Sequence, residues 1–216
     1  MRFGQYAASA AGGGARQLCY DSAFAFHPIR MLHTSPITLR AMQPGDLDAI
    51  LQVQAACYPA PMQEGADVVL ARIRQAGDTS FVAARQDGAI LAYVFAYRSV
   101  QGAVTPLDAR FDVATAGDTL YLHDLAVAPQ AAGQGLARRL AAHVDALARR
   151  QGNRWCALVS VQDSRRFWER LGYCATDCAT QQARAALASY PPGALYMTLD
   201  LPRPIPAAHA DASSLL

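Results

Sequence analysis

The chain has 216 residues, a length that fits one domain with short extensions. Its formal net charge of +2 gives no support for a nucleic-acid-binding protein, and no apolar run approaches the roughly twenty residues that cross a bilayer. The five cysteines are irregularly spaced and form no CxxC pair, which argues against a zinc site or other metal and favours reduced thiols in the cytoplasm.

The chain divides into an extension, a domain and a tail. Residues 1–35 show no sustained hydrophobic period, and we expect them to form a poorly ordered N-terminal extension. The single domain runs over 36–201. Residues 202–216 are rich in Pro and Ala, and we expect a flexible C-terminal tail.

The domain begins with a strand and two helices. Alternation over 37–41 predicts the strand. Helical spacing of apolar residues predicts helices over 47–57 and 66–75, and Asp46 is expected to cap the first of them.

A hairpin and a further strand follow. Apolar runs at 81–84 and 90–97 flank Asp87-Gly88, a dipeptide typical of tight hairpin turns. Both faces of 90–97 are apolar, which predicts a central strand covered on both sides. Residues 101–118 form a long loop, which we expect to be disordered or functional, and 119–127 are the next strand.

The last elements alternate. The spacing of leucines and Val144 predicts a helix over 133–151, followed by a strand over 155–161. A helix is expected from a cap at Asp163 to residue 170, and a closing strand over 194–201. This order predicts a mixed α/β fold, with a mostly antiparallel central sheet flanked by helices.

The turn before the 133–151 helix carries the first functional signal. A strand ending in Leu125-Ala126-Val127 leads into Gln130-Ala131-Ala132-Gly133-Gln134-Gly135 and then the helix. The first N–H groups of a helix have no intrahelical partner, and the dipole adds positive potential there. The turn is therefore suited to a pyrophosphate, which glycines allow to approach closely. The alternative interpretation is a glycine-containing loop before an amphipathic helix.

Two linked motifs carry a family resemblance. Gln130-x-x-Gly133-x-Gly135 resembles the [QR]-x-x-G-x-[GA] coenzyme A motif of the GNAT superfamily of N-acetyltransferases. Residues 163–173, DSRRFWERLGY, resemble its second motif, in which a helix with an aromatic pair ends in Leu-Gly-[Phe/Tyr]. The resemblance covers residues 37–201 and implies the GNAT acyltransferase fold with acetyl-CoA as cosubstrate.

The resemblance also implies where acetyl-CoA is bound. Backbone amides from Gln130 to Leu136 would hold the pyrophosphate. Leu125 and Val127 would pair with the pantetheine arm as an added strand does. The implied cofactor-binding residues are Leu125, Ala126, Val127, Gln130, Ala131, Ala132, Gly133, Gln134, Gly135, Leu136, Ala137, Ser164, Phe167 and Trp168, of which the aromatic pair would border the acetyl–sulfur end.

His123 is the best candidate for the group that accepts the amine proton, because histidine changes its charge near neutral pH. Alternation places Tyr121, His123 and Leu125 on one face of the strand and Asp124 on the other, although a β-bulge would change this. The segment resembles the corresponding strand of arylalkylamine N-acetyltransferases, in which histidines relay the proton. Tyr121 stands at the second relay position and is also a catalytic candidate. The alternative is a hydrogen-bonded core histidine.

Trp168 departs from the commonest family pattern. Many members have a Tyr second in the aromatic pair, and its hydroxyl protonates the departing thiolate. Trp Nε1–H donates a hydrogen bond but does not release its proton. We therefore expect Trp168 to orient the sulfur and Tyr173, Tyr121 or water to supply the proton. The alternative for Trp168 is core packing.

The acceptor is expected between the early helices, the central strands and the closing loops. Tyr58 and Tyr93 are candidates for an aromatic wall suited to an arylalkyl or other small amine, and Glu64 for attracting its charge. The alternatives are core aromatics and a solvated carboxylate. Met62 and Tyr97 extend the proposed wall, and Asp108 and Asp112 are further candidate carboxylates.

These patterns predict a cytoplasmic, acetyl-CoA-dependent N-acetyltransferase that acts on a small primary amine as a monomer or homodimer, with no metal, nucleic acid or membrane partner. Two alternatives stay open. The acceptor is a protein N-terminus or lysine, which needs an open groove, or the chain is a non-catalytic coenzyme A-binding sensor, which the absence of Tyr at position 168 would suit.

Overall fold

The computed structural model describes residues 36–202, so the extension predicted at 1–35 and the tail from 203 onward lie outside the described residues. The strands are β1 (Ile37–Ala41), β2 (Phe81–Arg85), β3 (Ile90–Ser99), β4 (Thr119–Val127), β5 (Trp155–Ser160), β6 (Cys174–Ala175) and β7 (Leu195–Asp200). The helices are α1 (Leu47–Cys57), α2 (Ala66–Ala76), α3 (Leu136–Arg150), α4 (Arg165–Glu169) and α5 (Gln181–Leu187).

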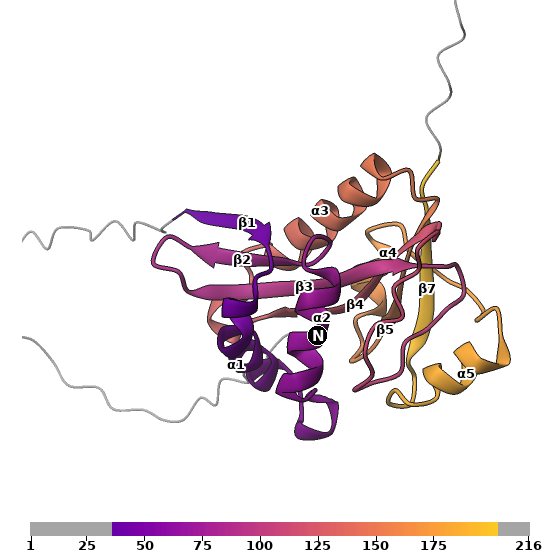
Figure 1. Ribbon diagram of the computed structural model, residues 1–216, viewed down its shortest axis with the longest axis horizontal. Coiled ribbons are helices and arrows are strands. Elements are labelled where there is room, and N and C mark those ends of the chain that lie inside the picture. Colours follow the sequence, from indigo (N-terminus) through magenta and orange to yellow (C-terminus); the bar gives the residue numbers. More distant parts are fainter. Residues whose placement is uncertain (1–35, 203–216) are drawn as a thin grey trace, which may run out of the picture.

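The strands form one seven-stranded sheet in the order β1-β2-β3-β4-β5-β7-β6 (Figure 1). Every neighbouring pair is antiparallel except β4 and β5, which are parallel. The predicted mixed, mostly antiparallel sheet is therefore confirmed. Among the described helices, none combines the length and the apolar character that crossing a membrane requires.

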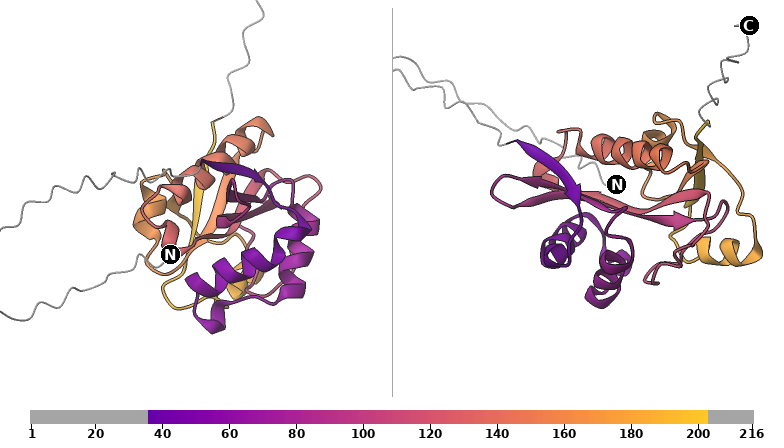
Figure 2. Two further views of the ribbon diagram at one scale, coloured as in Figure 1. Left: turned by 90° about the vertical axis from the view of Figure 1, so that its left-hand side faces the viewer. Right: turned by 45° about the horizontal axis from the view of Figure 1, so that its top comes forward.

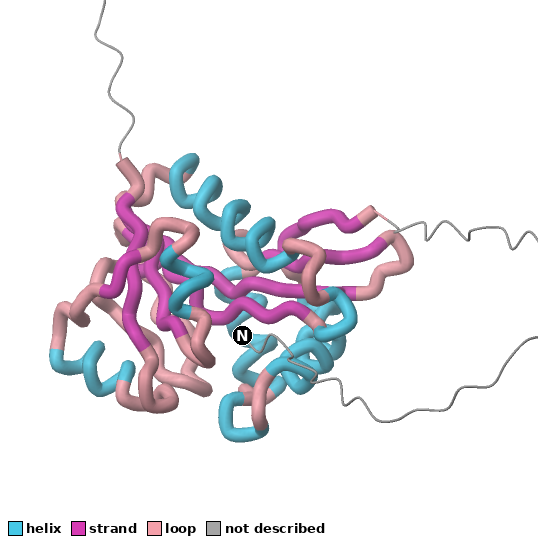
Figure 3. The backbone as a smooth tube through the Cα atoms, turned by 180° about the vertical axis from the view of Figure 1, so that it is seen from behind, coloured by secondary structure: helices cyan, strands magenta, loops and turns pink. Residues whose placement is uncertain are grey.

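Helices cover both faces of the sheet, and each face has its own core. Helices α1 and α2 lie on one face and α3 on the other (Figures 2 and 3). The first core includes Tyr93, Tyr97 and Phe111 on the α1–α2 side. The second includes Leu136 and the rest of the α3 stripe, Leu140 and Val144, which is buried as its spacing predicts.

Strand β4 contains the bulge that positions the site. Phe95 of β3 pairs with Asp124 and Ala96 pairs with Leu122, so His123 is an extra residue on β4. Leu125 packs in the α3-side core. The bulge turns both His123 and Asp124 to the α1–α2 side, where each has its contacts. The prediction from strict alternation is therefore wrong for Leu125 and Asp124.

Strands β4 and β5 separate beyond the bulge. Their pairing runs only from Thr119–Trp155 to Leu122–Leu158, whereas β4 continues to Val127. Strand β5 pairs with β7 along its whole length. Among the described residues, the backbone of β4 after Leu122 therefore has one edge without a strand partner.

Of the two predicted aspartate caps, one has the right position and the other is wrong. Asp46 is the N-cap residue of α1, but its carboxylate makes no capping bond to that helix; it accepts two hydrogen bonds from Arg40, each 2.7 Å, and one from the backbone N–H of Gln43 at 2.8 Å. Asp163 has φ 57° and precedes the capping position, which Ser164 occupies. Helix α3 also begins at Leu136 rather than 133, because Gly133 and Gly135 adopt left-handed conformations.

Candidate active site

A cavity opens where β4 and β5 separate. Its wall combines the end of both strands, the start of α4, the segment between α1 and α2, and two loops. The lining residues are Tyr58, Met62, Glu64, Leu107, Leu122, His123, Asp124, Leu125, Leu158, Val159, Val161, Ser164, Trp168 and Tyr190. Distant parts of the sequence thus meet here around one histidine.

The imidazole of His123 is held by one nitrogen. Its Nε2 lies 3.2 Å from Oε1 of Glu64. An ionised carboxylate only accepts hydrogen bonds, so Nε2 must carry the proton. Nδ1 is buried and has no hydrogen-bond partner among the described residues. In the neutral ring, Nδ1 therefore keeps a lone pair that no described residue uses.

Glu64 is buried, contrary to the alternative of a solvated carboxylate. Its oxygens accept hydrogen bonds from Arg72 Nη1 and from the backbone N–H of Asp108, the latter at 3.0 Å, in addition to His123. Burial alone would raise the pKa of Glu64, but the bonds with His123 and Arg72 lower it to about 2. Glu64 is therefore an ionised partner of His123.

Arg72 is a residue of this arrangement that the sequence analysis missed, as it missed Leu107, Leu122, Leu158, Val159, Val161 and Tyr190 of the cavity wall. Its side chain has no exposure. Nε and Nη2 donate to the carbonyl oxygen of Ala109 at 3.0 and 2.5 Å, and the guanidinium lies 4.8 Å from the ring centre of Phe111. The sequence does contain a signal that Arg72 is buried. Arg72 follows Val68 and Val69 at helical spacing and therefore lies on the buried face of α2.

Asp124 forms a second buried cluster beside His123. The hydroxyls of Tyr58 and Tyr93 each donate to its carboxylate at 2.5 Å. Burial, together with the nearby charge of Glu64, raises the pKa of Asp124. Tyr58 lines the cavity as predicted, whereas Tyr93 is fully buried beneath Asp124 and does not line it.

The two tyrosines expected to protonate the thiolate do not line the cavity. Tyr121 is fully buried, with its ring 5.3 Å from that of Tyr97 and 6.4 Å from that of His123. Burial, reinforced by neighbouring tyrosines, raises its pKa well above the usual value. Tyr173 donates to Asp145 at 2.7 Å in the α3-side core. The cavity-lining residues that carry a hydroxyl are Tyr58, Ser164 and Tyr190.

The start of α4 contributes Ser164 and Trp168 to the wall. Their spacing of one helical turn puts both on the same side of the helix. The Ser164 hydroxyl shares a 3.0 Å hydrogen bond with that of Ser160. Phe167 packs edge-on against Trp168, with ring centres 4.9 Å apart, and is not part of the wall.

The turn before α3 forms an open cradle. Gly133 and Gly135 have φ 77° and 73°, and a Cβ on either would meet nothing within 4 Å. The N–H groups of Ala131 and Ala132 bond to carbonyls inside the turn at 2.8 and 3.1 Å. The amides left for a phosphate are therefore those from Gly133 onward, a shorter stretch than the resemblance implies.

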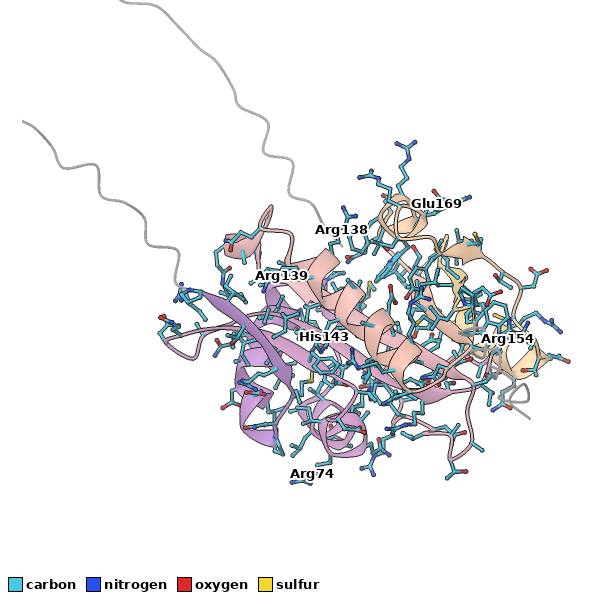
Figure 4. All side chains as sticks on the ribbon, turned by 90° about the horizontal axis from the view of Figure 1, so that it is seen from above. Arg74, Arg138, Arg139, His143, Arg154 and Glu169 are labelled. Atoms are coloured by element: carbon cyan, nitrogen blue, oxygen red, sulfur yellow. The ribbon has the colours of Figure 1, made fainter. Side chains whose placement is uncertain are left out.

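Positive side chains flank this cradle. Arg138 and Arg139 project from the first turn of α3, and α4, marked by Glu169, lies on the same face of the sheet (Figure 4). Arg139 donates to the carbonyl of Ile37 at 3.0 Å, whereas Arg138 is exposed. The cradle and Arg138 together fit an anionic group.

A second hollow adjoins the cavity and shares Met62 and Val161 with it. Gln162 and Asp163, at its floor, both have left-handed backbone conformations, with φ 51° and 57°. The rest of its wall is mostly apolar and consists of Pro59, Pro191, Pro192, Gly193 and Ala194. Within residues 36–202, no three His, Cys, Asp or Glu side chains are grouped to hold a metal ion.

Comparison with known proteins assigns a family. The family model described as "Acetyltransferase (GNAT) family" matches residues 47–173, more than half of the chain. A search of the curated proteins gave no match.

Solved structures share the fold. The GphF GNAT-like decarboxylase in complex with isobutyryl-CoA is 20% identical, with a TM-score of 0.61 over 76% of this chain and 100% of that one. The ribosomal-protein-S18-alanine N-acetyltransferase from Escherichia coli is 17% identical, with a TM-score of 0.57 over 79% and 97%. The PaiA N-acetyltransferase from Thermoplasma acidophilum in complex with coenzyme A is 12% identical, with a TM-score of 0.55 over 77% and 99%. At these identities the likeness concerns the fold alone.

Proposed function

Because the chain belongs to the acetyltransferase (GNAT) family, we propose that it transfers the acetyl group of acetyl-CoA to a primary amine, with His123 as general base. One observation carries the proposal. His123 lies on the cavity wall with Nε2 bound to the Glu64 carboxylate and Nδ1 without a partner. This is the arrangement that a base needs, one nitrogen fixed and the other free to accept a proton.

The donor side of the site suits acetyl-CoA. The amides from Gly133 onward and Arg138 would hold its phosphates, and the unpaired edge of β4 after Leu122 would bond its pantetheine arm. Leu125 and Trp168 would border the acetyl end. When bound, acetyl-CoA supplies the thioester whose carbonyl carbon is attacked.

The residues of the chain would then move the proton of the amine. Nδ1 of His123 accepts the proton of the attacking amine, and Glu64 stabilises the imidazolium that results. The same proton, passed on from the imidazolium through water, would neutralise the departing thiolate. The hydroxyl of Ser164, one helical turn from Trp168 and 3.0 Å from the hydroxyl of Ser160, would donate a hydrogen bond to the sulfur.

The acceptor that the cavity supports best is a small primary amine with an apolar body, arylalkylamines included. Leu107 and Tyr190 add apolar surface to the cavity wall, which favours an acceptor with an apolar body. The adjoining hollow of Pro, Met and Val side chains offers room for an aromatic or aliphatic group. With Glu64 paired to Arg72, the carboxylate of Asp124 leaves the site favourable to a cation.

The second candidate is acetylation of a protein N-terminus, and the same hollow motivates it, because it extends the cavity past Met62 and Val161 and would hold the residues that follow an N-terminal amine. A neighbour of the same fold is described as acting on an alanine of ribosomal protein S18. Arylalkylamines, aliphatic amines and short peptides, offered in one panel with acetyl-CoA, would separate the two acceptors. Coenzyme A binding without thiol release on any of them would favour the sensor alternative instead.

His123→Ala tests the base assignment. Free thiol release at pH 7 should fall more than about tenfold, the lower end expected for loss of a general base. The affinity for coenzyme A, measured by calorimetry, should not change. His143→Ala is the control, because His143 packs on Phe81 on the opposite face of the sheet. An unchanged rate and pH–rate profile in His123→Ala would remove His123 from the mechanism.

A further inference from the structure

Arg72 has a place in the site that base catalysis by His123 alone does not explain. Its guanidinium is fully buried and holds Oε2 of Glu64 through Nη1, while Oε1 of the same carboxylate faces His123. Burying an arginine is costly unless its charge is paired. A neutral residue of similar length would fill the same space without that cost. Packing alone therefore does not explain why the residue at this position is charged.

The charge of Arg72 acts first on Glu64. Glu64 lies in an apolar setting that by itself favours the protonated carboxyl. Arg72 supplies the one permanent positive charge bonded to it, since His123 is charged only when it holds a second proton. The bonds to His123 and to Arg72 both lower the pKa of Glu64, so loss of Arg72 would raise that pKa.

The protonation of Glu64 in turn decides which nitrogen of His123 carries the ring proton. A carboxylate accepts a hydrogen bond from Nε2–H and leaves the lone pair on Nδ1. A carboxyl group donates its own O–H to Nε2, which moves the ring proton to Nδ1. In the second case, Nδ1 would already be protonated and could not accept a proton from an amine.

We infer that Arg72 is a positioning residue that acts through Glu64 to keep the ring proton of His123 on Nε2, so that Nδ1 stays free as the base. The inference rests on the proposed function for its catalytic consequence, but the proton position can be measured without turnover. Arg72 does not itself reach the cavity wall.

The loop between β3 and β4 completes this arrangement. The N–H of Asp108 bonds Oε1 of Glu64, and the carbonyl of Ala109 accepts from Nε and Nη2 of Arg72. Phe111 places its ring 5.3 Å from that of His123 and beneath the guanidinium. Arg72 therefore has a fixed orientation, with one end of its fork on the loop and the other on Glu64.

Two substitutions separate the charge of Arg72 from its hydrogen bonds. Arg72→Gln keeps donors but removes the charge, and Arg72→Lys keeps the charge but loses the planar fork. Nitrogen-15 NMR of the histidine-labelled full-length protein would report the tautomer of His123 at a pH where the ring is neutral. The signal is assigned by its loss in His123→Asn. Arg74→Gln, an exposed arginine on the same helix, is the matched control.

The expected result is a wild-type ring protonated at Nε2, the same tautomer in Arg72→Lys and Arg74→Gln, and a shift toward Nδ1–H in Arg72→Gln. Thiol release by Arg72→Gln should fall about tenfold or more in kcat, as for loss of the base, with unchanged KM for acetyl-CoA. A folded Arg72→Gln with the wild-type tautomer would overturn the inference. If that variant does not fold, an Nδ1–H tautomer in Arg72→Lys would overturn it equally.

The two proposals fail in different ways. If no amine is acetylated but the tautomer responds to Arg72→Gln as expected, the proposed function is wrong and the positioning role stands. If the wild type acetylates an amine but the tautomer ignores the charge at position 72, only the positioning role is wrong.

Discussion

The charged side chains at this site are held in place by hydrogen bonds to one another and to their neighbours. Arg72 and Glu64 are buried and Asp124 is half-buried, and each has hydrogen bonds to its charged atoms. In such clusters the hydrogen bonds must first offset the cost of removing the charges from water. Their value here is geometric: they fix one nitrogen of His123 and leave the other open.

The substitution Glu64→Gln should make the stability of the protein less dependent on pH. The folded pKa of Glu64 is about 2, below its ordinary 4.5. Its ionisation therefore stabilises the fold fully above pH 4.5, and this contribution is lost as the pH falls from there toward 2. The shift corresponds to a contribution on the order of 3 kcal/mol. Urea unfolding at a series of pH values should show the wild type losing its advantage over Glu64→Gln on acidification.

Asp87→Asn is the control for that measurement. Asp87 pairs with Arg85 at an exposed hairpin turn, where an ion pair contributes little to stability. Its stability difference from the wild type should stay small at every pH. A difference between wild type and Glu64→Gln that is the same at pH 7 and pH 3 would contradict the assignment of Glu64 as a buried, ionised partner.

Among the elements, strand β4 shows where prediction from sequence reaches its limit. The strand, the turn after it and α3 follow from alternation, from Pro129 and from the leucine spacing. The bulge at His123 does not, because it depends on how β4 pairs with β3. That one extra residue puts Asp124 beside His123 and takes Leu125 to the other face. The sequence was sufficient to name candidate residues. It was not sufficient to predict which of them lie in contact.

For the turn before α3, coenzyme A binding and backbone strain can be tested separately. Gly133→Ala forces an alanine into φ 77°, which costs about 1–2 kcal/mol of stability. It also adds a Cβ to the cradle and should weaken coenzyme A binding about tenfold or more. Gly88→Ala is the match: Gly88 has φ 86° in the hairpin turn, also with nothing within 4 Å. Calorimetry should find coenzyme A affinity reduced only in Gly133→Ala, whereas thermal unfolding should detect similar losses in both.

Over the whole molecule, the sheet separates two hydrophobic cores, and each core supports a different part of the candidate site. The α3 side carries the cradle and packs Trp168, and the α1–α2 side packs the ring of Phe111 against His123. The sheet and its covering helices were predictable because their periods are strong. The ordering of loop 101–118 was not, since it depends on single distant bonds such as Tyr190 to the carbonyl of Thr105 at 2.8 Å. The short β6 and the alanine-rich α5 were missed because neither has a distinct apolar period.

This division predicts that losing a large aromatic side chain affects catalysis on one face only. Phe111→Ala removes a ring stacked 4.2 Å from Tyr97 and in edge contact with His123. Phe81→Ala removes a ring of the other core, 4.4 Å from His143. Each should cost about 3–5 kcal/mol of stability, as buried Phe→Ala changes do. Both variants are assayed at a temperature where both are folded. Phe111→Ala should lower kcat for thiol release about tenfold, because His123 loses the ring that packs against it. Phe81→Ala should keep a near wild-type kcat. Equal losses of kcat in the two variants would mean that the base is held by the sheet as a whole and not by the loop on its own face.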